Sequence, residues 1–292
     1  MNNLLCNDDS LRSMFVELET SSPIYQPSDF WQKLNTIHES QLSNKGFNNF
    51  KRTVNMRYFN WRTLGIIRHQ LGVVLNELKE PLVGNPFIIH YNDMLLSQDL
   101  CNSIHEYYTI YTHSKSLKHK KLAELGAGYG RLAYCFLKSV PSISYCIIDI
   151  PPALFIAQKY LSKLFPKDDI FFFRPFKSFS SVKKQFTRSR ISFIMPQQMS
   201  LIPDDYFDIF INISSLHEMS RDKINNYLLQ IDRLTKSFFY SKQWRRSRVK
   251  DNQFIKENEY MTPSHWKMVF KRSPHPIQRM FFDALYKTRI SL

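Results

Sequence analysis

The chain has 292 residues, of which 43% are hydrophobic and 22% are charged, and this balance excludes wholesale disorder. Such a length can form one large domain or a main domain with a helical accessory part. The formal net charge is +15, and residues 236–292 carry thirteen basic residues against four acidic ones. A basic surface can attract nucleic acid, an anionic membrane or a phosphorylated substrate, or it can be solvated without a partner, so charge alone excludes none of these.

No segment has the roughly 18 consecutive uncharged apolar residues of a membrane-spanning helix, and the N-terminus lacks the basic and apolar regions of a signal peptide. The four cysteines form no CxxC pair, and no histidine cluster has the spacing of metal ligands. We therefore expect a cytoplasmic protein without a metal site, whose basic surface can associate peripherally with the inner face of an anionic membrane.

The first third of the chain contains helical patterns of apolar residues. One follows Ser28, a candidate N-cap, a second covers 58–78, and a third begins at Ser97. We therefore expect residues 1–115 to form a helical N-terminal cap or substrate region.

Strand and helix patterns alternate from residue 116 onward, which predicts an α/β fold with a mostly parallel sheet and helices on both faces. Two further strand patterns near the C-terminus flank "SPHPI" at 273–277 and suit an antiparallel hairpin at one edge of the sheet. The strand patterns of the alternating part cover 120–126, 143–150, 191–198, 206–215 and 237–244.

Residues 171–190 do not fit this alternation. They include six basic residues and no acidic residue, interleaved with phenylalanines. We interpret them as a basic insertion, which is either a solvated linker anchored by its phenylalanines or a dedicated binding element.

A glycine-rich loop, "LAELGAGYGR" at 122–131, joins a predicted strand to a predicted helix and holds three of the seven glycines in the chain. Glycines allow a tight turn and a close approach of a ligand to the backbone, and the following helix presents free N–H groups. The spacing matches neither GxGxxG nor the P-loop. Asp149 ends the next strand, where a carboxylate can bind both hydroxyls of a ribose. The alternative is a chance glycine turn, and we favour a site for a nucleoside-type cofactor.

These residues resemble the class I S-adenosylmethionine-dependent methyltransferases: "ELGAGYG" is similar to their first motif and Asp149 to their ribose-binding acid. The resemblance implies a Rossmann-like, seven-stranded, mostly parallel sheet with an antiparallel terminal hairpin, and S-adenosyl-L-methionine as the cofactor. It also implies that Glu124 orients the amino group of the cofactor. Gln197 or Gln198 would then lie beside adenine. The cofactor contacts it implies are Glu124, Gly126, Ala127, Gly128, Gly130, Asp149, Ile150, Gln197, Gln198 and Asn212.

The stretches "DIPPALFIAQ" and "NISSLHEM" are more specific than the glycine loop, and they resemble the sugar O-methyltransferases of bacterial surface-polysaccharide biosynthesis. The stretches "NFKRTVNMRYFNW" and "FFYSKQW" extend this resemblance beyond the glycine loop in both directions. It implies methyl transfer to a sugar hydroxyl in polysaccharide, lipopolysaccharide or capsule biosynthesis, with a small-molecule, nucleotide-linked or lipid-linked sugar as substrate.

His217 and Glu218 follow the predicted fourth strand, at the edge of a parallel sheet where ligands collect. Methyl transfer requires alignment of acceptor and methyl group, and a base that removes the hydroxyl proton. His217 titrates in the right range for a base. Glu218 can orient the imidazole, act as the base or bind a sugar hydroxyl. Both side chains can instead be structural near a helix start, so the choice between them stays open.

The end of the fifth predicted strand offers candidate substrate-binding residues. Trp244 can stack on a sugar face, Gln243 can reach its hydroxyls, and neighbouring basic residues can meet a diphosphate, although a plain basic loop is an equal alternative. In the N-terminal part, Tyr58 and Trp61 are lid candidates, with core packing preferred. The predicted substrate-binding set is Lys242, Gln243, Trp244 and Arg245, with Arg246 and Arg248 as further diphosphate contacts.

Two other functions compete with sugar O-methylation. A nucleic-acid methyltransferase fits the charge, but the region after the fourth strand reads "NISSLHEM" and lacks the Asn/Asp-Pro-Pro-aromatic run of enzymes that methylate base amino groups. We therefore regard nucleic acid as the weaker candidate. A non-catalytic cofactor-binding partner in a biosynthetic complex is the second alternative.

Overall fold

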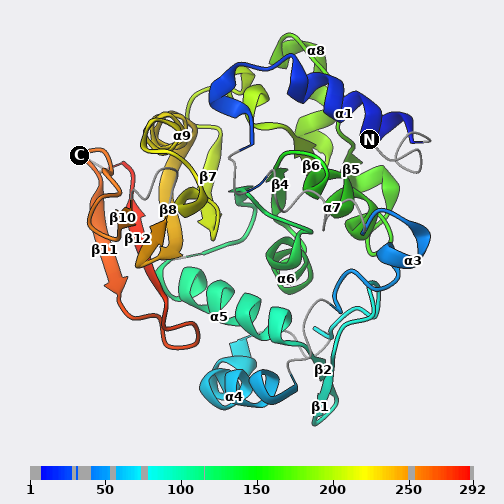
Figure 1. Cartoon of the computed structure of the whole chain (residues 1–292), viewed down its shortest axis with the longest axis vertical. Coiled ribbons are helices and arrows are strands. Elements are labelled where there is room, and N and C mark those ends of the chain that lie inside the picture. Colours follow the sequence, from blue (N-terminus) through cyan, green and yellow to red (C-terminus); the bar gives the residue numbers. More distant parts are fainter. Residues whose placement is uncertain are drawn as a thin grey trace.

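An eight-stranded sheet forms the centre of the computed structural model (Figure 1). The structure describes residues 8–27, 31, 41–52, 57–73, 78–114, 116–248 and 254–289, and most of the helix predicted after Ser28 lies outside them. The strands are β3 (Lys121–Leu125), β4 (Ser144–Ile148), β5 (Ile170–Phe171), β6 (Ile191–Ile194), β7 (Phe207–Ile213), β8 (Thr235–Trp244), β11 (Lys267–Arg272) and β12 (Phe281–Lys287).

The strand order is β11-β12-β8-β7-β3-β4-β6-β5, and β12 alone runs antiparallel to both of its neighbours. The pairs from β8 to β5 are all parallel. This confirms the predicted α/β fold with an antiparallel terminal hairpin. The sheet has one strand more than the seven expected, because Ile170 and Phe171 pair with β6 at the far edge.

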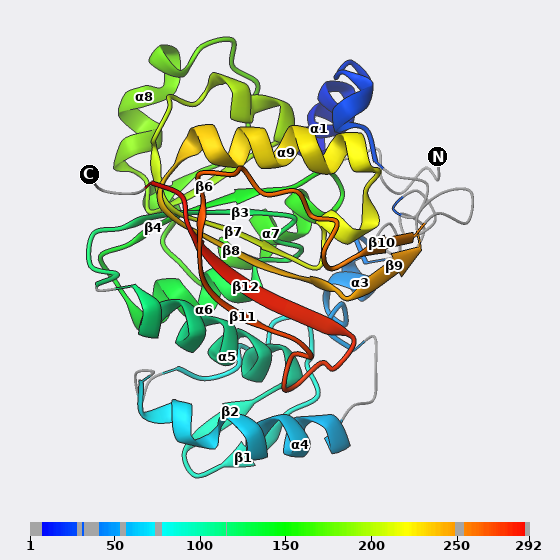
Figure 2. The same cartoon turned by 90° about the vertical axis from the view of Figure 1, so that its left-hand side faces the viewer.

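Helices cover both faces of this sheet, as Figure 2 shows with α9 and α8 above it and α6 and α5 below it. Successive strand residues point to opposite faces, so Ile147 of β4 joins one buried cluster and Ile148 joins the other. The first cluster contains residues of α5 (Gln98–His113), α6 (Arg131–Ser139) and α7 (Ala153–Leu161); the second contains those of α8 (Phe179–Arg188) and α9 (Arg221–Leu234).

Residues 171–190 do not form an excursion from the alternation. They contain the end of β5 and the helix α8, which returns the chain to β6. Phe179, Val182 and Phe186 of α8 are buried at helical spacing, whereas Lys183 and Lys184 are exposed. The phenylalanines anchor a helix and not a linker, because they lie on one face of it.

The N-terminal part is helical with one small hairpin. Its elements are α1 (Asp9–Glu19), η1 (Pro23–Tyr25), α3 (Asn44–Phe47), α4 (Arg57–Ile67), η2 (Arg68–Val73), β1 (Ile89–Tyr91) and β2 (Met94–Leu96). The helix predicted over 58–78 changes at Ile67 into the 3-10 segment η2. The helix predicted to begin at Ser97 is α5, and Ser97 caps it, since its side chain accepts a hydrogen bond from the Leu100 N–H. Leu11 and Ile104 share one buried cluster with Leu122 of the sheet, so the N-terminal part is packed into the same core.

The remaining elements are short. They are η3 (Lys167–Asp169), η4 (Pro196–Leu201), η5 (Leu216–Glu218), and the antiparallel pair β9 (Arg246–Arg248) and β10 (Phe254–Lys256). Within the described part of the chain, no helix has the length and apolar character needed to cross a membrane.

Candidate active site

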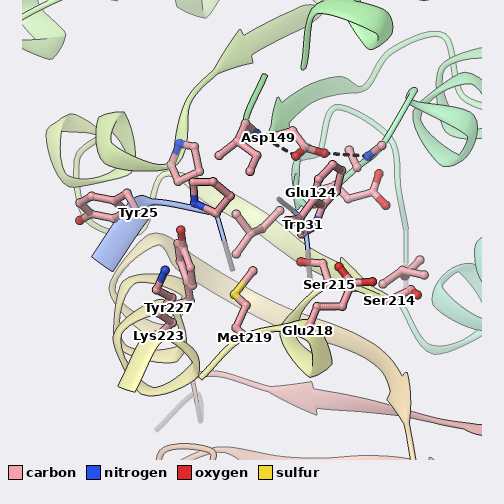
Figure 3. Close-up of a pocket in the computed structure, with 18 of the residues that line it drawn as sticks. Tyr25, Trp31, Glu124, Asp149, Ser214, Ser215, Glu218, Met219, Lys223 and Tyr227 are labelled. Carbon is pink, nitrogen blue, oxygen red and sulfur yellow. Dashed lines mark hydrogen bonds between the residues drawn. The ribbon is translucent and has the colours of Figure 1, made fainter. Parts of the chain in front are cut away.

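A pocket of about 360 Å³ opens where β3, β4 and β7 end (Figure 3). Its volume lies within the range of roughly 300–1,000 Å³ that small-molecule sites have. Its main walls are the glycine loop after β3, the end of β4, the segment from the end of β7 to Met219, and an N-terminal stretch around Tyr25. Single elements α5, η4 and α9 contribute Asp99, Pro196, and Lys223 and Tyr227. The edge of the sheet where the sequence predicted a cofactor is therefore hollow.

The glycine loop has a conformation that side chains would disturb. Gly126, Gly128 and Gly130 all have positive φ, of 72°, 57° and 83°. A Cβ on Gly126 would lie 2.3 Å from the Ser215 hydroxyl oxygen, so the loop and the end of β7 touch through this glycine. A Cβ on Gly128 would meet nothing within 4 Å, so this backbone faces open space in the pocket, as expected for a ligand cradle.

Asp149 supports the loop from the end of β4. One carboxyl oxygen accepts the Gly128 N–H at 2.8 Å, and the other accepts the Ile150 N–H, also at 2.8 Å (Figure 3). Burial raises the pKa of Asp149 to about 7, although both backbone hydrogen bonds oppose the shift. Asp149 and Ile150 both line the pocket, so the carboxyl group lies where a ribose can reach it.

Glu124 ends β3 and lines the same pocket, with Tyr145 donating a hydrogen bond to its carboxyl at 2.7 Å. Burial raises the pKa of Glu124 to about 8. Burial and, to a smaller extent, the nearby Asp149 raise the pKa of Glu218 to about 8, against the opposing hydrogen bond with Trp31. Three carboxyl groups with raised pKa values therefore line one pocket. A cationic ligand beside them would stabilise their ionised forms and lower these pKa values.

Not all predicted cofactor residues line the pocket. Gly126, Ala127 and Gly128 do, but Gly130 instead packs its α-carbon against Leu161. The Gln198 amide caps η4 by accepting the Met195 N–H. The Gln197 amide donates to the Glu17 carbonyl oxygen. Pro196, which precedes both glutamines, is the η4 residue in the pocket.

Asn212 is fully buried and acts as a brace between strand ends. Its amide donates to the Leu125 carbonyl oxygen at 2.8 Å and to the Ser215 hydroxyl at 3.1 Å. Its oxygen accepts from the Gln243 amide at 2.6 Å. Asn212 does not line the pocket; it holds the ends of β3, β7 and β8 together beneath it.

The structure separates the two catalytic candidates. Glu218 lines the pocket, and its carboxyl group has a hydrogen bond with the Trp31 side chain. His217 is 2% exposed and lies behind that wall, stacked on Trp244 with ring centroids 4.6 Å apart. Its Nε2 is 3.8 Å from a Glu218 oxygen. Burial lowers the pKa of His217 to about 4, so the ring is neutral at pH 7.

The residues predicted to bind substrate lie outside the pocket. Lys242 and Gln243 are fully buried: Lys242 pairs with Glu106 at 2.8 Å, and the Gln243 oxygen lies 3.2 Å from His217 Nδ1. Trp244 covers His217, and Arg245 pairs with Glu257 at 3.3 Å. All four face other protein groups instead of the cavity, because the end of β8 lies between η5 and β12.

The other predicted contacts also have protein partners or lie at the surface. Arg246 stacks its guanidinium over the Phe254 ring at 4.0 Å. Trp61 is 54% exposed on α4, so it is not a core residue. The side chain of Tyr58 and any contact it makes lie outside the described residues.

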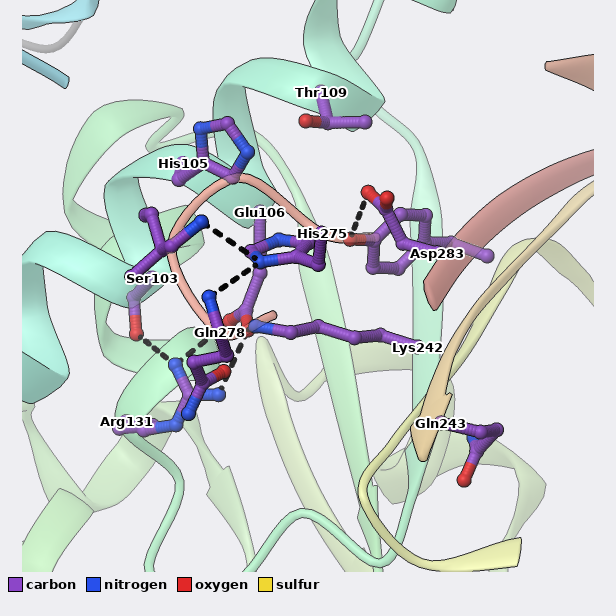
Figure 4. A network of polar contacts seen from close by, with 12 residues as sticks. Ser103, His105, Glu106, Thr109, Arg131, Lys242, Gln243, His275, Gln278 and Asp283 are labelled. Atoms are coloured by element: carbon purple, nitrogen blue, oxygen red, sulfur yellow. Dashed lines mark hydrogen bonds and ion pairs between the residues drawn. The ribbon is translucent and has the colours of Figure 1, made fainter. Parts of the chain in front are cut away.

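A buried polar network lies beneath the pocket, between α5, α6 and β8 (Figure 4). Arg131 donates to both carboxyl oxygens of Glu106, at 2.7 and 3.0 Å, and Lys242 donates to the same group. These two cations hold the pKa of Glu106 at about 2 despite its complete burial. Arg131 also lines the pocket, so the network connects to the pocket through this residue.

Several lining residues were missed by the sequence analysis. Tyr129 and Arg131 lie within the glycine-rich stretch 122–131, and their position in that motif is a signal that can find them. Tyr25 and Tyr227 come from η1 and α9, with rings 6.2 Å apart, and no local pattern relates them. The missed residues of the pocket are Tyr25, Gln26, Pro27, Trp31, Leu125, Asp99, Tyr129, Arg131, Pro196, Ile213, Ser214, Ser215, Met219, Lys223 and Tyr227.

Within the described residues, no group of three or more histidine, cysteine, aspartate or glutamate side chains has the arrangement of a metal site.

Among known proteins, no family model matches the chain. No curated protein matches it either.

Solved structures are similar to this chain at low sequence identity and with TM-scores below 0.5. A Burkholderia thailandensis 1,6-didemethyltoxoflavin-N1-methyltransferase, solved with S-adenosylhomocysteine, is 14% identical with a TM-score of 0.41, covering 68% of this chain and 94% of that one. A SAM-dependent methyltransferase from Aquifex aeolicus is 12% identical with a TM-score of 0.38, covering 59% and 84%. The cyclase SpnF is 11% identical with a TM-score of 0.47, covering 79% and 95%.

Proposed function

We propose that the protein is an S-adenosyl-L-methionine-dependent O-methyltransferase that acts on a sugar hydroxyl in surface-polysaccharide, lipopolysaccharide or capsule biosynthesis. The single observation that carries this proposal is the pocket itself. An open glycine cradle at Gly128 and the ribose-binding candidate Asp149 lie in it, together with carboxyl groups whose pKa values are raised by burial. A nucleoside that carries positive charge matches all of these features.

The residues present fit each part of this cofactor. Asp149 suits the ribose hydroxyls, with Ile150 and Pro196 as apolar neighbours for the base. Glu124 suits the ammonium group, and Arg131 suits the carboxylate as a hydrogen-bond donor. When bound, S-adenosyl-L-methionine supplies an electrophilic methyl group for in-line attack by an acceptor oxygen.

Glu218 is the residue we propose as the general base. Its carboxyl lies in the pocket with its pKa near 8 in the free protein, and a cationic ligand beside it favours the ionised form that accepts a proton. His217 supports Glu218 from behind, with its Nδ1 beside the Gln243 oxygen and its Nε2 toward the carboxyl. Glu218 thus takes the proton of the acceptor hydroxyl, and His217 positions it.

The sugar acceptor rests on the resemblance of "DIPPALFIAQ" and "NISSLHEM" together with the lining of the pocket. Tyr25, Trp31 and Tyr227 offer aromatic faces for a sugar ring, and Ser214 and Asp99 offer hydrogen-bonding groups for its hydroxyls. Nucleotide-linked and lipid-linked sugars are made in the cytoplasm or at the inner membrane face, where we propose that the protein works.

Isothermal titration with S-adenosyl-L-methionine and S-adenosylhomocysteine tests the cofactor. We expect binding that is lost in Asp149→Ala and kept in Asp168→Ala, an acidic residue outside the pocket. No binding of either compound by the native chain would refute the proposal.

Turnover on a glycan acceptor panel tests the chemistry. Glu218→Gln should lower kcat by about 10²–10⁴-fold, whereas His217→Ala should lower it less and should keep cofactor affinity. Full turnover in Glu218→Gln would remove the base assignment while leaving the enzyme. Tight cofactor binding with no methylated sugar would instead favour a non-catalytic binding partner.

A further inference from the structure

A second cavity, of about 410 Å³, lies outside the active-site pocket between α4 and the chain entering β12. Its volume is also typical of a small-molecule site. Its wall includes Arg62 and Thr63 of α4, Gln98 at the start of α5, and Gln278, Arg279 and Phe281 from the other side. Segments more than 200 residues apart in the chain therefore form one concave surface.

The charge of this cavity is one-sided. Arg62 and Arg279 are both exposed cations, and the nine described residues of its wall include no acidic side chain. Neither arginine forms an ion pair with another described residue. By contrast, Arg245 and Arg272 nearby are paired with Glu257 and Asp283. Thr63, Gln98 and Gln278 add neutral groups that form hydrogen bonds, so the cavity fits an anion with several oxygens.

The cavity lies near the active-site pocket at two places, where protein side chains separate the two spaces. Gln98 lines the cavity, and its neighbour Asp99 lines the pocket. On the other wall, the Phe281 ring lies 5.9 Å from the ring of His217, whose Nε2 is 3.8 Å from the pocket residue Glu218. The two spaces therefore lie on either side of the start of α5 and of the buried Phe281 and His217 rings.

We propose that this cavity binds a phosphate-bearing group of the methyl acceptor, held by Arg62 and Arg279 while the sugar lies in the active-site pocket. The inference rests on the proposed sugar O-methyltransferase function and names its substrate class: a sugar attached to phosphate or diphosphate. The sequence predicted diphosphate contacts at Arg245, Arg246 and Arg248. This proposal assigns them to Arg62 and Arg279 instead.

The test is titration calorimetry of the whole chain with three probes: inorganic pyrophosphate, uridine diphosphate and farnesyl diphosphate. Arg62→Gln/Arg279→Gln is compared with Lys184→Gln/Arg188→Gln, which removes two cations that line a different surface hollow on α8. We expect the first pair to weaken pyrophosphate binding by at least about tenfold, and the second to leave it within about twofold. Circular dichroism checks that both variants are folded.

Each result decides the proposal. Failure of the native chain to bind any probe, or equal weakening in both double variants, overturns it. Tighter binding of uridine diphosphate than of pyrophosphate supports a nucleotide-linked acceptor, and tighter binding of farnesyl diphosphate supports a lipid-linked one. S-adenosylhomocysteine is titrated into the same samples, so loss of the proposed cofactor site is distinguished from loss of the phosphate site: each can fail while the other persists.

Discussion

Cofactor affinity should rise with pH, because the active-site pocket contains three carboxyl groups that are protonated in the free protein near neutral pH. The pKa values are about 8 for Glu124, about 7 for Asp149 and about 8 for Glu218, each raised by burial. A cationic ligand favours their ionised forms and lowers these pKa values, so binding releases protons. Affinity therefore increases as pH rises toward the free-state pKa values and levels off above them.

The magnitude follows from linkage. For each carboxyl that ionises on binding, Kd falls by about tenfold per pH unit below the free-state pKa. Between pH 6 and 7 we therefore expect a fall of about tenfold or more in the Kd of S-adenosyl-L-methionine, with a plateau above pH 8 to 9. Calorimetry in buffers of different ionisation enthalpy counts the protons released. Glu218→Gln should remove its share of the slope, while the exposed Glu19→Gln should not change it.

The same raised pKa values determine whether the stability of the ligand-free fold rises or falls with pH. A carboxyl whose folded pKa lies above its unfolded pKa stabilises the fold at low pH, and this contribution is lost as pH rises through the folded pKa. The ligand-free protein should therefore lose thermal stability as pH rises from about 4.5 to about 8, and the bound cofactor should restore it. A Kd of S-adenosyl-L-methionine that is constant from pH 6 to 9, with no proton release on binding, would refute the prediction that cofactor affinity rises with pH.

Three substitutions test the fold around the site. Gly126→Ala places a Cβ against the end of β7 at positive φ, so it should lower the free energy of unfolding by about 1–3 kcal/mol and abolish cofactor binding. The control Gly65→Ala places its Cβ in open space and should leave that free energy, measured by urea unfolding, unchanged or higher. Glu106→Gln leaves two buried cations without their carboxylate and should cost about 3–5 kcal/mol; retention of native stability would show that the network is dispensable. Phe186→Ala should cost about 3–5 kcal/mol, as expected for an anchored helix α8, and a loss below about 1 kcal/mol would instead favour a linker.

Local patterns predicted the parts of this fold whose residues are close in sequence. The period of the apolar residues located β3, β4, β7 and β8, and the glycine spacing located the turn that faces the pocket. The error at 171–190 has a physical cause. Composition drew attention to the basic side chains, and the helical spacing of Phe179, Val182 and Phe186, which is that of a buried helix face, was not used.

The direction in which a side chain points could not be predicted, because it depends on packing between distant segments. Lys242 and Gln243 end a strand at the correct edge of the sheet, yet β12 and η5 enclose them, so they bind protein groups. Tyr25 reaches the pocket only because η1 packs on α9. Sequence position identifies the edge of the sheet, and tertiary contacts select which residues face the ligand.

His217 and Glu218, the two catalytic candidates, illustrate this limit. They are adjacent in η5, and a 3-10 turn directs consecutive side chains about 120° apart. Glu218 therefore faces the pocket while His217 faces Trp244 and Gln243. The same burial lowers the pKa of the histidine and raises that of the glutamate, which leaves a neutral imidazole behind a carboxyl group that titrates near pH 8. This geometry and these pKa shifts are the grounds on which we propose Glu218, and not His217, as the general base, a choice that the sequence left open.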